Sequence, residues 1–153
     1  MSESSREPVA GTLRALVALV RESEREMALR LGLNLTDYRA LCALAELGPL
    51  TSGRLAEELG YTAATTTAIT KRLELRGYVS RERSETDRRL VTLSASPEAS
   101  QRILDLTLPL VSVLSEKLQA LPADQITTVV AFLDVTQDLM RTHLQILSSE
   151  DAT

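Results

Sequence analysis

Hydrophobic residues recur at three-, four- and seven-residue intervals along most of the chain, which is the spacing of one face of an α-helix. Over residues 9–31 this pattern predicts a long amphipathic helix with a charged stretch in its middle. A further helical stretch is predicted over residues 97–147. Pro97 suits a first helical position, whereas Pro109 lacks an N–H inside the pattern and should kink the helix or split it in two. Leu121 and Pro122 mark a corner before the last long helix.

Three shorter helices are predicted between these long ones from their capping residues. Threonine is favoured as a helix N-cap, and glycine is favoured as the left-handed residue that ends a helix. The predicted helices are residues 37–47 after Thr36, 52–59 between Thr51 and Gly60, and 62–76 before Gly77. Gly48 and Pro49 end the first of the three, because proline disfavours helical geometry at the residue before it.

The segment after Gly77 has the pattern of a β-hairpin. Val79 and Arg81 alternate with Ser80 and Glu82, a polar turn follows over residues 85–87, and a second alternating run leads to residue 94. Two short helices joined by a tight glycine-containing turn, with a hairpin behind them, form a winged helix-turn-helix. The predicted fold is therefore mainly α with a small β-hairpin wing. It is expected to be one domain over residues 1–153, with a winged helix-turn-helix at 36–94 and terminal helices at 9–31 and 97–147.

The helix predicted over residues 62–76 has two different faces. One face is a stripe suited to a core, and it holds Thr66, Ile69 and Leu73. The opposite face, which is small, polar and cationic, holds Ala64, Thr67, Ala68 and Lys71. This second face is therefore expected to point to solvent or to a ligand.

Charge is unevenly distributed along the chain. The whole protein has a net charge of −4 and a pI near 5.1, which argues against a protein that coats nucleic acid or an anionic membrane non-specifically. Residues 62–93 nevertheless hold seven basic and four acidic side chains. A basic segment on an acidic protein creates a local electrostatic field and not a global one. The alternative is that an arginine-rich hairpin is simply solvated.

Other chemistry is sparse. Hydrophobic residues make up 44% and charged residues 25% of the chain. It has a polar N-terminus and no apolar run of membrane-spanning length, so a cytoplasmic protein is expected.

Cys42 is the single cysteine and is expected to be a small buried hydrophobe, with a redox role as the less favoured alternative. His143 has no second histidine to form a metal site. Without a phosphate-binding loop or a nucleophile–base pair, no catalytic residue, cofactor or metal is predicted, and the protein is not expected to be an enzyme.

Two stretches, LTDYRALCAL and LTSGRLAEELGYTAATTTAITKRLELRGYVSRERSETDRRLVTLS, resemble the multiple-antibiotic-resistance regulator (MarR) family of bacterial winged-helix transcription factors. The resemblance extends over residues 12–147. Its most specific parts are the Thr66, Ile69, Arg72, Leu73 pattern, the Arg-Gly-Tyr-Val exit from the helix, and Asp87-Arg88-Arg89 before an apolar strand. The function it implies is a sequence-specific DNA-binding transcriptional regulator, usually a repressor.

The resemblance implies a set of DNA-contacting residues on the 62–76 helix and on the hairpin. Of the helix residues, Thr67 would bond a base edge or a phosphate, Ala64 and Ala68 would touch apolar groups such as thymine methyls, and Thr62, Thr65, Lys71 and Arg72 would contact phosphates. At the wing, Arg88 matches the family arginine that enters the minor groove, Asp87 would hold that arginine, and Arg89 would contact a phosphate. Because the helix face is poor in Arg, Asn and Gln, specificity is expected to rely on DNA shape and on the wing.

The terminal helices carry more apolar residues than one small domain covers, which favours a homodimer over helices that fold back on their own domain. A dimer would match a pseudo-palindromic site in double-stranded DNA.

The resemblance also implies release of DNA by a small aromatic or phenolic effector. The candidate residues for the effector crevice are Leu16, Val20, Tyr38, Leu41 and Ile103. These residues are equally well explained as core. The alternative function is a winged-helix module whose basic wing binds an acidic protein.

Overall fold

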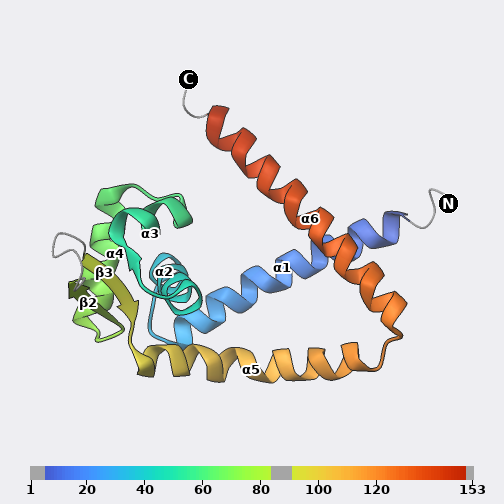
Figure 1. Cartoon of the computed structure of the whole chain (residues 1–153), viewed down its shortest axis with the longest axis horizontal. Helices are drawn as coiled ribbons and strands as arrows, with labels where there is room; N and C mark the ends of the chain where they lie inside the picture. Colours follow the sequence, from blue (N-terminus) through green and yellow to red (C-terminus); the bar gives the residue numbers. More distant parts are fainter. Residues whose placement is uncertain (1–5, 84–90, 151–153) are drawn as a thin grey trace. The chain divides into compact units, whose positions relative to one another are not determined.

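The computed structural model describes residues 6–83 and 91–150 of the chain. The chain divides into two compact units, Met1–Thr107 and Leu108–Thr153. The elements, shown in Figure 1, are α1 (Arg6–Arg30), α2 (Leu35–Leu47), β1 (Leu50–Thr51), α3 (Ser52–Leu59), α4 (Ala63–Leu75), β2 (Val79–Arg83), β3 (Val91–Ala95), α5 (Pro97–Gln119) and α6 (Ala123–Glu150). The prediction of a mainly helical chain with a small antiparallel sheet is confirmed.

Capping residues set the bounds of the short helices. Thr51 and Thr62 accept hydrogen bonds from the backbone N–H groups of Arg54 and Thr65, so both predicted N-caps are confirmed. The predicted cap of α2 is wrong: Asn34, not Thr36, accepts the bond from the Asp37 N–H, at 2.8 Å. Asparagine is at least as good a cap as threonine, and the Thr36 hydroxyl instead donates to Asn34 Oδ1, at 2.7 Å.

Glycines end the two helices of the helix-turn-helix as predicted. Gly60, at φ +66°, follows α3, and its N–H donates to the carbonyl of Glu57 at 3.3 Å. Gly77, at φ +72°, follows α4, and its N–H donates to the carbonyl of Glu74 at 2.9 Å. Both glycines have a left-handed backbone, in which a residue with a side chain would be strained.

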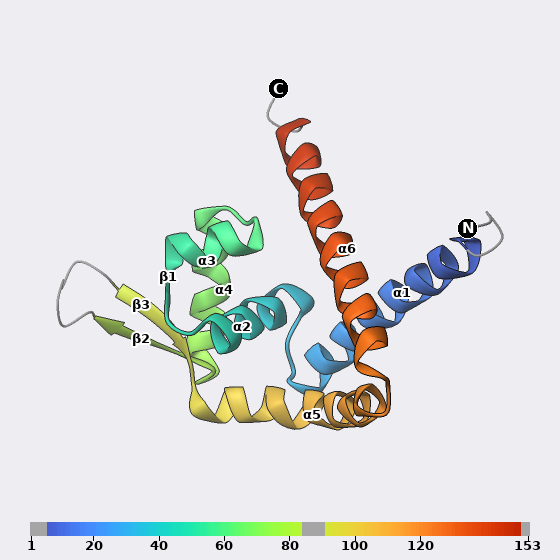
Figure 2. The same cartoon turned by 45° about the vertical axis from the view of Figure 1, so that its right-hand side comes forward.

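The wing belongs to a three-stranded antiparallel sheet with the order β1–β3–β2. The two predicted hairpin strands pair from Val79 opposite Ala95 to Arg83 opposite Val91, and Figure 2 shows them side by side. The predicted turn at 85–87 lies outside the described residues. The sequence did not predict β1, in which Leu50 lies opposite Leu93, because two residues are too few to show an alternating pattern.

The core of the first unit lies where α2, α3, α4 and β3 meet. Its largest fully buried side chains are Leu41, Leu44, Leu55, Thr66, Ile69, Thr70, Leu73 and Leu93. The predicted inward face of α4 is thus confirmed. Helix α4 is fixed by this packing, because its apolar stripe is removed from water.

Helix α5 begins as predicted, since the Ser96 hydroxyl accepts the N–H of Ala99 at 3.2 Å and Pro97 is the first helical residue. Of the kink or split expected at Pro109, the split does not occur, because α5 runs through this proline as one helix. The proline removes one backbone hydrogen bond inside α5, and the kink remains a prediction.

The second unit exposes much of its apolar surface. None of its described residues is buried, and its exposed large hydrophobic side chains include Val113, Leu114, Val129, Leu133, Leu139, Met140, Leu144 and Leu147. Helix α1 likewise exposes Val9, Leu16, Leu19 and Val20. Even so, no helix among the described residues is both long enough and apolar enough to cross a membrane.

Candidate nucleic-acid interface

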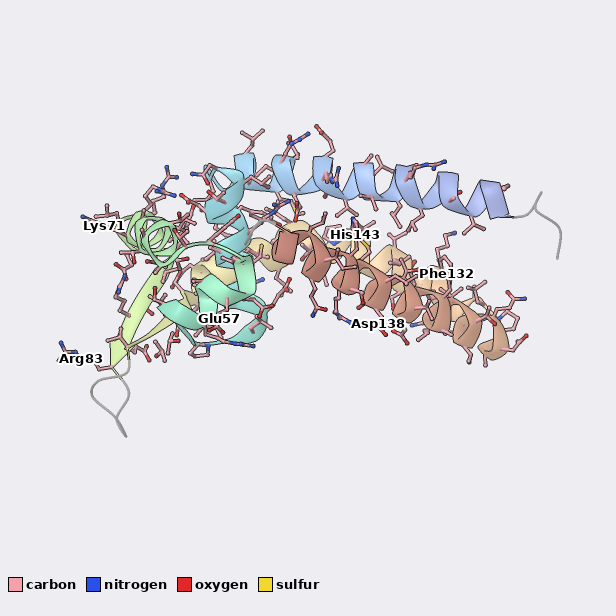
Figure 3. The ribbon with its side chains drawn as sticks, turned by 90° about the horizontal axis from the view of Figure 1, so that it is seen from above. Glu57, Lys71, Arg83, Phe132, Asp138 and His143 are labelled. Carbon is pink, nitrogen blue, oxygen red and sulfur yellow. The ribbon has the colours of Figure 1, made fainter. Side chains whose placement is uncertain are left out.

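The outer face of α4 presents the residues predicted for it. Ala64, Thr67, Ala68 and Lys71 are all exposed, at the i, i+3, i+4, i+7 spacing of a single helix face. Figure 3 shows Lys71 pointing away from α4. Among the described residues, no carboxylate lies within ion-pair distance of Lys71, so its ammonium group is available to an anion.

Two hydroxyl groups meet at the N-terminus of α4. The Oγ1 atom of Thr62 accepts the Thr65 N–H at 3.2 Å, and the two side-chain oxygens lie 2.9 Å apart. One hydroxyl hydrogen joins the two oxygens, which leaves the other free to donate. A free donor at the positive end of a helix dipole suits a phosphate oxygen, as predicted for these residues.

The Thr67 hydroxyl makes a hydrogen bond that the sequence did not predict. Its hydroxyl donates to the carbonyl oxygen of Ala63 at 2.8 Å. The single hydrogen of the hydroxyl is therefore used within the helix, and the oxygen retains only acceptor capacity toward a ligand.

Arg72 lies at the edge of this face and is held by a second helix. Its guanidinium donates to both carboxylate oxygens of Asp37 on α2, from Nε at 2.9 Å and from Nη2 at 2.5 Å. The hydrogen bond that Arg72 donates to Asp37 raises the pKa of Arg72. This pair was not predicted, because the two residues are 35 positions apart. The pair with Asp37 thus holds the last turn of α4 against α2. The phosphate contact expected of Arg72 remains a prediction.

Strand β2 of the wing carries two further arginines, of which one contacts α4. Arg81 on β2 bonds the Glu74 carboxylate, and its Nη2 donates to Thr70 Oγ1 at 3.3 Å, so it fixes the wing to α4. Arg83, at the end of β2, is exposed and points outward in Figure 3. The sequence showed both as part of a basic segment without separating their roles. The predicted wing contacts Asp87, Arg88 and Arg89 lie outside the described residues.

The five residues predicted to line an effector crevice differ in their exposure in the described chain. Tyr38 and Leu41 are buried in the core, and Ile103 packs against that core. Leu16 and Val20, in contrast, are 51% and 52% exposed on α1. Burial raises the pKa of Tyr38, as expected for a core phenol, and its hydroxyl lies 3.4 Å from Met27 Sδ.

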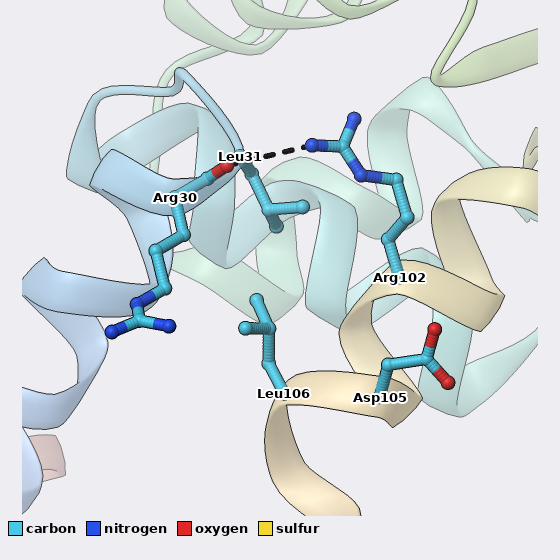
Figure 4. A pocket seen from close by; sticks show the side chains of 5 residues that line it. All are labelled: Arg30, Leu31, Arg102, Asp105 and Leu106. Carbon is cyan, nitrogen blue, oxygen red and sulfur yellow. Dashed lines mark hydrogen bonds between the residues drawn. The ribbon is translucent and has the colours of Figure 1, made fainter.

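A shallow pocket of about 190 Å³ lies elsewhere in the first unit, between the end of α1 and the start of α5. It is lined by Arg30, Leu31, Arg102, Asp105 and Leu106, as Figure 4 shows, and by none of the predicted effector residues. The Arg102 guanidinium is already engaged, since it donates to the Tyr78 hydroxyl at 2.6 Å and to the Arg30 carbonyl at 3.4 Å.

Cys42 is half-buried, and its pKa is raised by burial, which makes its thiol a poor nucleophile at neutral pH. The prediction was a small buried side chain, and the structure bears it out only in part, since Cys42 is partly buried and packs against the core. Within the described residues, no group of three histidine, cysteine or acidic side chains could hold a metal ion.

Comparison with known proteins agrees with this arrangement. The MarR family model matches residues 33–91. The uncharacterized HTH-type transcriptional regulator YcgE of Bacillus subtilis is 32% identical over 115 residues, which is 75% of this chain and 75% of that protein.

Two solved structures share the fold. A MarR family protein from Bacillus stearothermophilus has a TM-score of 0.69 at 23% identity and covers 92% of this chain and 99% of its own. A mutant of S. aureus MepR, bound to an oligodeoxyribonucleotide, has a TM-score of 0.58 at 14% identity over 86% of this chain and 97% of its own. The alignment with YcgE covers three quarters of both chains, and the helix-turn-helix matches the MarR family model. This chain therefore belongs to the MarR family of DNA-binding transcriptional regulators, which are not enzymes.

Proposed function

We propose that this protein is a homodimeric repressor that binds a pseudo-palindromic site in duplex DNA. Helix α4 enters the major groove through its outer face, and the wing, with Arg88, reaches the adjacent minor groove. The observation that carries the proposal is the exposed face of α4, where Lys71 is unpaired among the described residues while the opposite face is buried. A regulator of this kind acts on the chromosome, and so in the bacterial cytoplasm.

The homodimer is supported by the apolar surface of the terminal helices. Helices α1, α5 and α6 expose many large hydrophobic side chains, with Leu19 at 67% and Leu110 at 70%. Soluble proteins rarely leave contiguous surfaces of this kind uncovered, and a second copy is the simplest cover. A two-fold dimer also presents two α4 helices to half-sites about 34 Å apart, one turn of DNA.

Release by a small aromatic acid completes the proposed function. An effector acts only if it binds one dimer geometry more tightly than another. Of the candidate contacts, Leu16 and Val20 are exposed on α1 in a single chain. In the proposed dimer they would lie at the surface between the two copies, where such a ligand would contact them. Benzoate is a suitable probe: it should weaken DNA binding by the wild type, and the effect should shrink in Leu16→Ala. Unchanged DNA binding at millimolar benzoate and related phenols would remove this part of the proposal.

Selection from a random duplex pool tests the DNA-binding role. We expect the wild type to recover a two-fold-symmetric site, and Lys71→Ala and Arg88→Ala to bind that site more weakly. Lys117→Ala is the matched control, because it also removes an exposed lysine, from α5 and outside the winged helix-turn-helix. Recovery of no motif, or equal losses for Lys71→Ala and Lys117→Ala, would contradict the proposed role of α4.

Salt dependence separates this function from a module that binds an acidic protein. The logarithm of the DNA affinity should fall with the logarithm of the salt concentration, with a slope of about −0.9 per phosphate contacted. Lys71→Ala should therefore reduce the slope by about one for each half-site. If no duplex binds at low salt, capture of an acidic protein partner becomes the function to test.

A further inference from the structure

The outer face of α4 carries a single side chain that could read guanine, Lys71, and it lies at the C-terminal end of that face. Guanine is usually recognised by an arginine or lysine that donates to O6 and N7. Arg72, the only arginine within α4, spends its Nε and Nη2 donors on Asp37 at 2.9 and 2.5 Å. Lys71 is the one other cation of this helix, and it lies one full turn beyond Thr67 toward the C-terminus. The middle of the face is therefore left to small side chains.

These small side chains offer methyl groups and one acceptor. Ala64 and Ala68 are exposed and lie one helical turn apart. Thr67 lies between them, and because its hydroxyl hydrogen is bonded to the Ala63 carbonyl at 2.8 Å, its oxygen has only lone pairs to offer. In the major groove, only thymine presents a methyl group, and only adenine and cytosine present amino donors.

We propose that α4 reads thymine 5-methyl groups with Ala64 and Ala68 and an exocyclic amino donor, that of adenine in a T·A pair, with the Thr67 oxygen. This assignment rests on the proposed entry of α4 into the major groove. It differs from recognition by DNA shape or by the wing, because it makes the affinity depend on single functional groups of the bases. The half-site contacted by α4 is accordingly built around thymine and adenine.

Replacement of thymine by uracil in the selected site tests the methyl contacts, because uracil lacks only the 5-methyl group. We expect one or two thymines per half-site at which uracil weakens binding about four-fold, the value for removing one buried methyl-sized group. Cytosine at the same position should bind more weakly than 5-methylcytosine. If uracil at each thymine in turn leaves the dissociation constant unchanged, the methyl contacts do not exist.

Protein variants locate these contacts on α4. In Ala64→Ser or Ala68→Ser, the penalty for uracil should fall toward one-fold at the thymine that the altered residue touches. Ala120→Ser is the control, since it makes the same change at an exposed position between α5 and α6 and should retain the full penalty. A penalty that persists unchanged in both α4 variants would overturn the assignment to these alanines.

The acceptor role of Thr67 has its own base analogue. 2-Aminopurine still pairs with thymine but moves the amino group to the minor groove. At the adenine read by Thr67 it should weaken binding about five-fold, as for loss of one neutral hydrogen bond. Thr67→Val keeps the side-chain shape without the oxygen and should abolish this sensitivity. Equal sensitivity in Thr67→Val and wild type would overturn the role of Thr67.

The outcomes distinguish this inference from the function on which it rests. If no duplex site is recovered, the proposed DNA-binding function fails and the inference fails with it. If a symmetric site is recovered and Lys71→Ala weakens its binding, but uracil and 2-aminopurine have no effect at any position, the function stands and only the base-reading inference is overturned.

Discussion

Arg72 and Asp37 join the last turn of α4 to the first turn of α2 through two parallel hydrogen bonds of 2.9 and 2.5 Å. The Asp37 side chain is 4% exposed, whereas that of Arg72 is 46% exposed. The carboxylate is therefore almost out of water and depends on the guanidinium and on the positive end of α2. This pair therefore fixes α4, the helix proposed to read DNA, to α2.

Removal of the guanidinium should destabilise the first unit. We expect Arg72→Ala to lower the free energy of unfolding by about 2 kcal/mol, less than for a fully buried pair because water reaches Arg72. Arg141→Ala, which breaks an exposed pair with Asp138 on α6, should cost less than about 0.5 kcal/mol. Urea denaturation at one fixed protein concentration measures both. Equal losses would mean that the Asp37 carboxylate does not need its partner.

Thr66 provides a test in the opposite direction. Its hydroxyl oxygen is buried in α4 and has no hydrogen-bond partner among the described residues. We expect Thr66→Val, which keeps the shape and removes the unsatisfied hydroxyl, to stabilise the protein by about 1 kcal/mol. Thr70→Val is the matched comparison, because the Thr70 hydroxyl donates to the Thr67 carbonyl at 3.1 Å and accepts from Arg81. That change should destabilise by about 1 kcal/mol, and thermal unfolding of the two variants should shift in opposite directions.

Tyr78 lies between α4 and β2 and connects the residue that follows α1 to α5. Its hydroxyl donates to the Leu31 carbonyl at 3.0 Å and accepts from Arg102 at 2.6 Å, and the Arg102 guanidinium also lies 5.6 Å from its ring centroid. Tyr78→Phe should cost about 1–2 kcal/mol of stability. A double-mutant cycle with Arg102→Ala should give a coupling energy of about 1 kcal/mol. A coupling energy of zero would show that the contact has no energetic consequence.

Stability should fall at alkaline pH. Burial raises the pKa values of both Cys42 and Tyr38, so each group binds its proton more tightly in the folded than in the unfolded protein. The resulting stability is fully present below the unfolded pKa values, about 8.5 for the thiol and about 10 for the phenol, and is lost as the pH rises above them.

Urea denaturation between pH 8 and pH 11 measures this loss. The difference in stability between wild type and Cys42→Ala should become smaller as the pH rises, because only the wild type carries the thiol contribution. A difference that stays constant or grows would contradict a buried, protonated thiol.

The local sequence determined most of the secondary structure of this protein. The caps Thr51 and Thr62 and the stops Gly60 and Gly77 act through bonds to residues at most a few positions away, so their pattern is readable along the chain. The two faces of α4 were also predictable, because residues three and four positions apart in a helix lie on the same face. Asn34 shows the limit of this reasoning. Asn34 and Thr36 are both suitable capping residues two positions apart, and only the structure shows that Asn34 is the cap.

The sequence by itself thus determined the helices, the hairpin strands, the winged helix-turn-helix and the MarR resemblance, because each depends on near neighbours or on a short motif. Only the tertiary structure decided that Arg72 pairs with Asp37, that Tyr78 meets Arg102, that β1 joins the sheet, and that Tyr38 and Leu41 lie in the core apart from the exposed Leu16. These relationships join residues far apart in the chain. Their partners are selected by packing and desolvation in three dimensions, which no local pattern encodes.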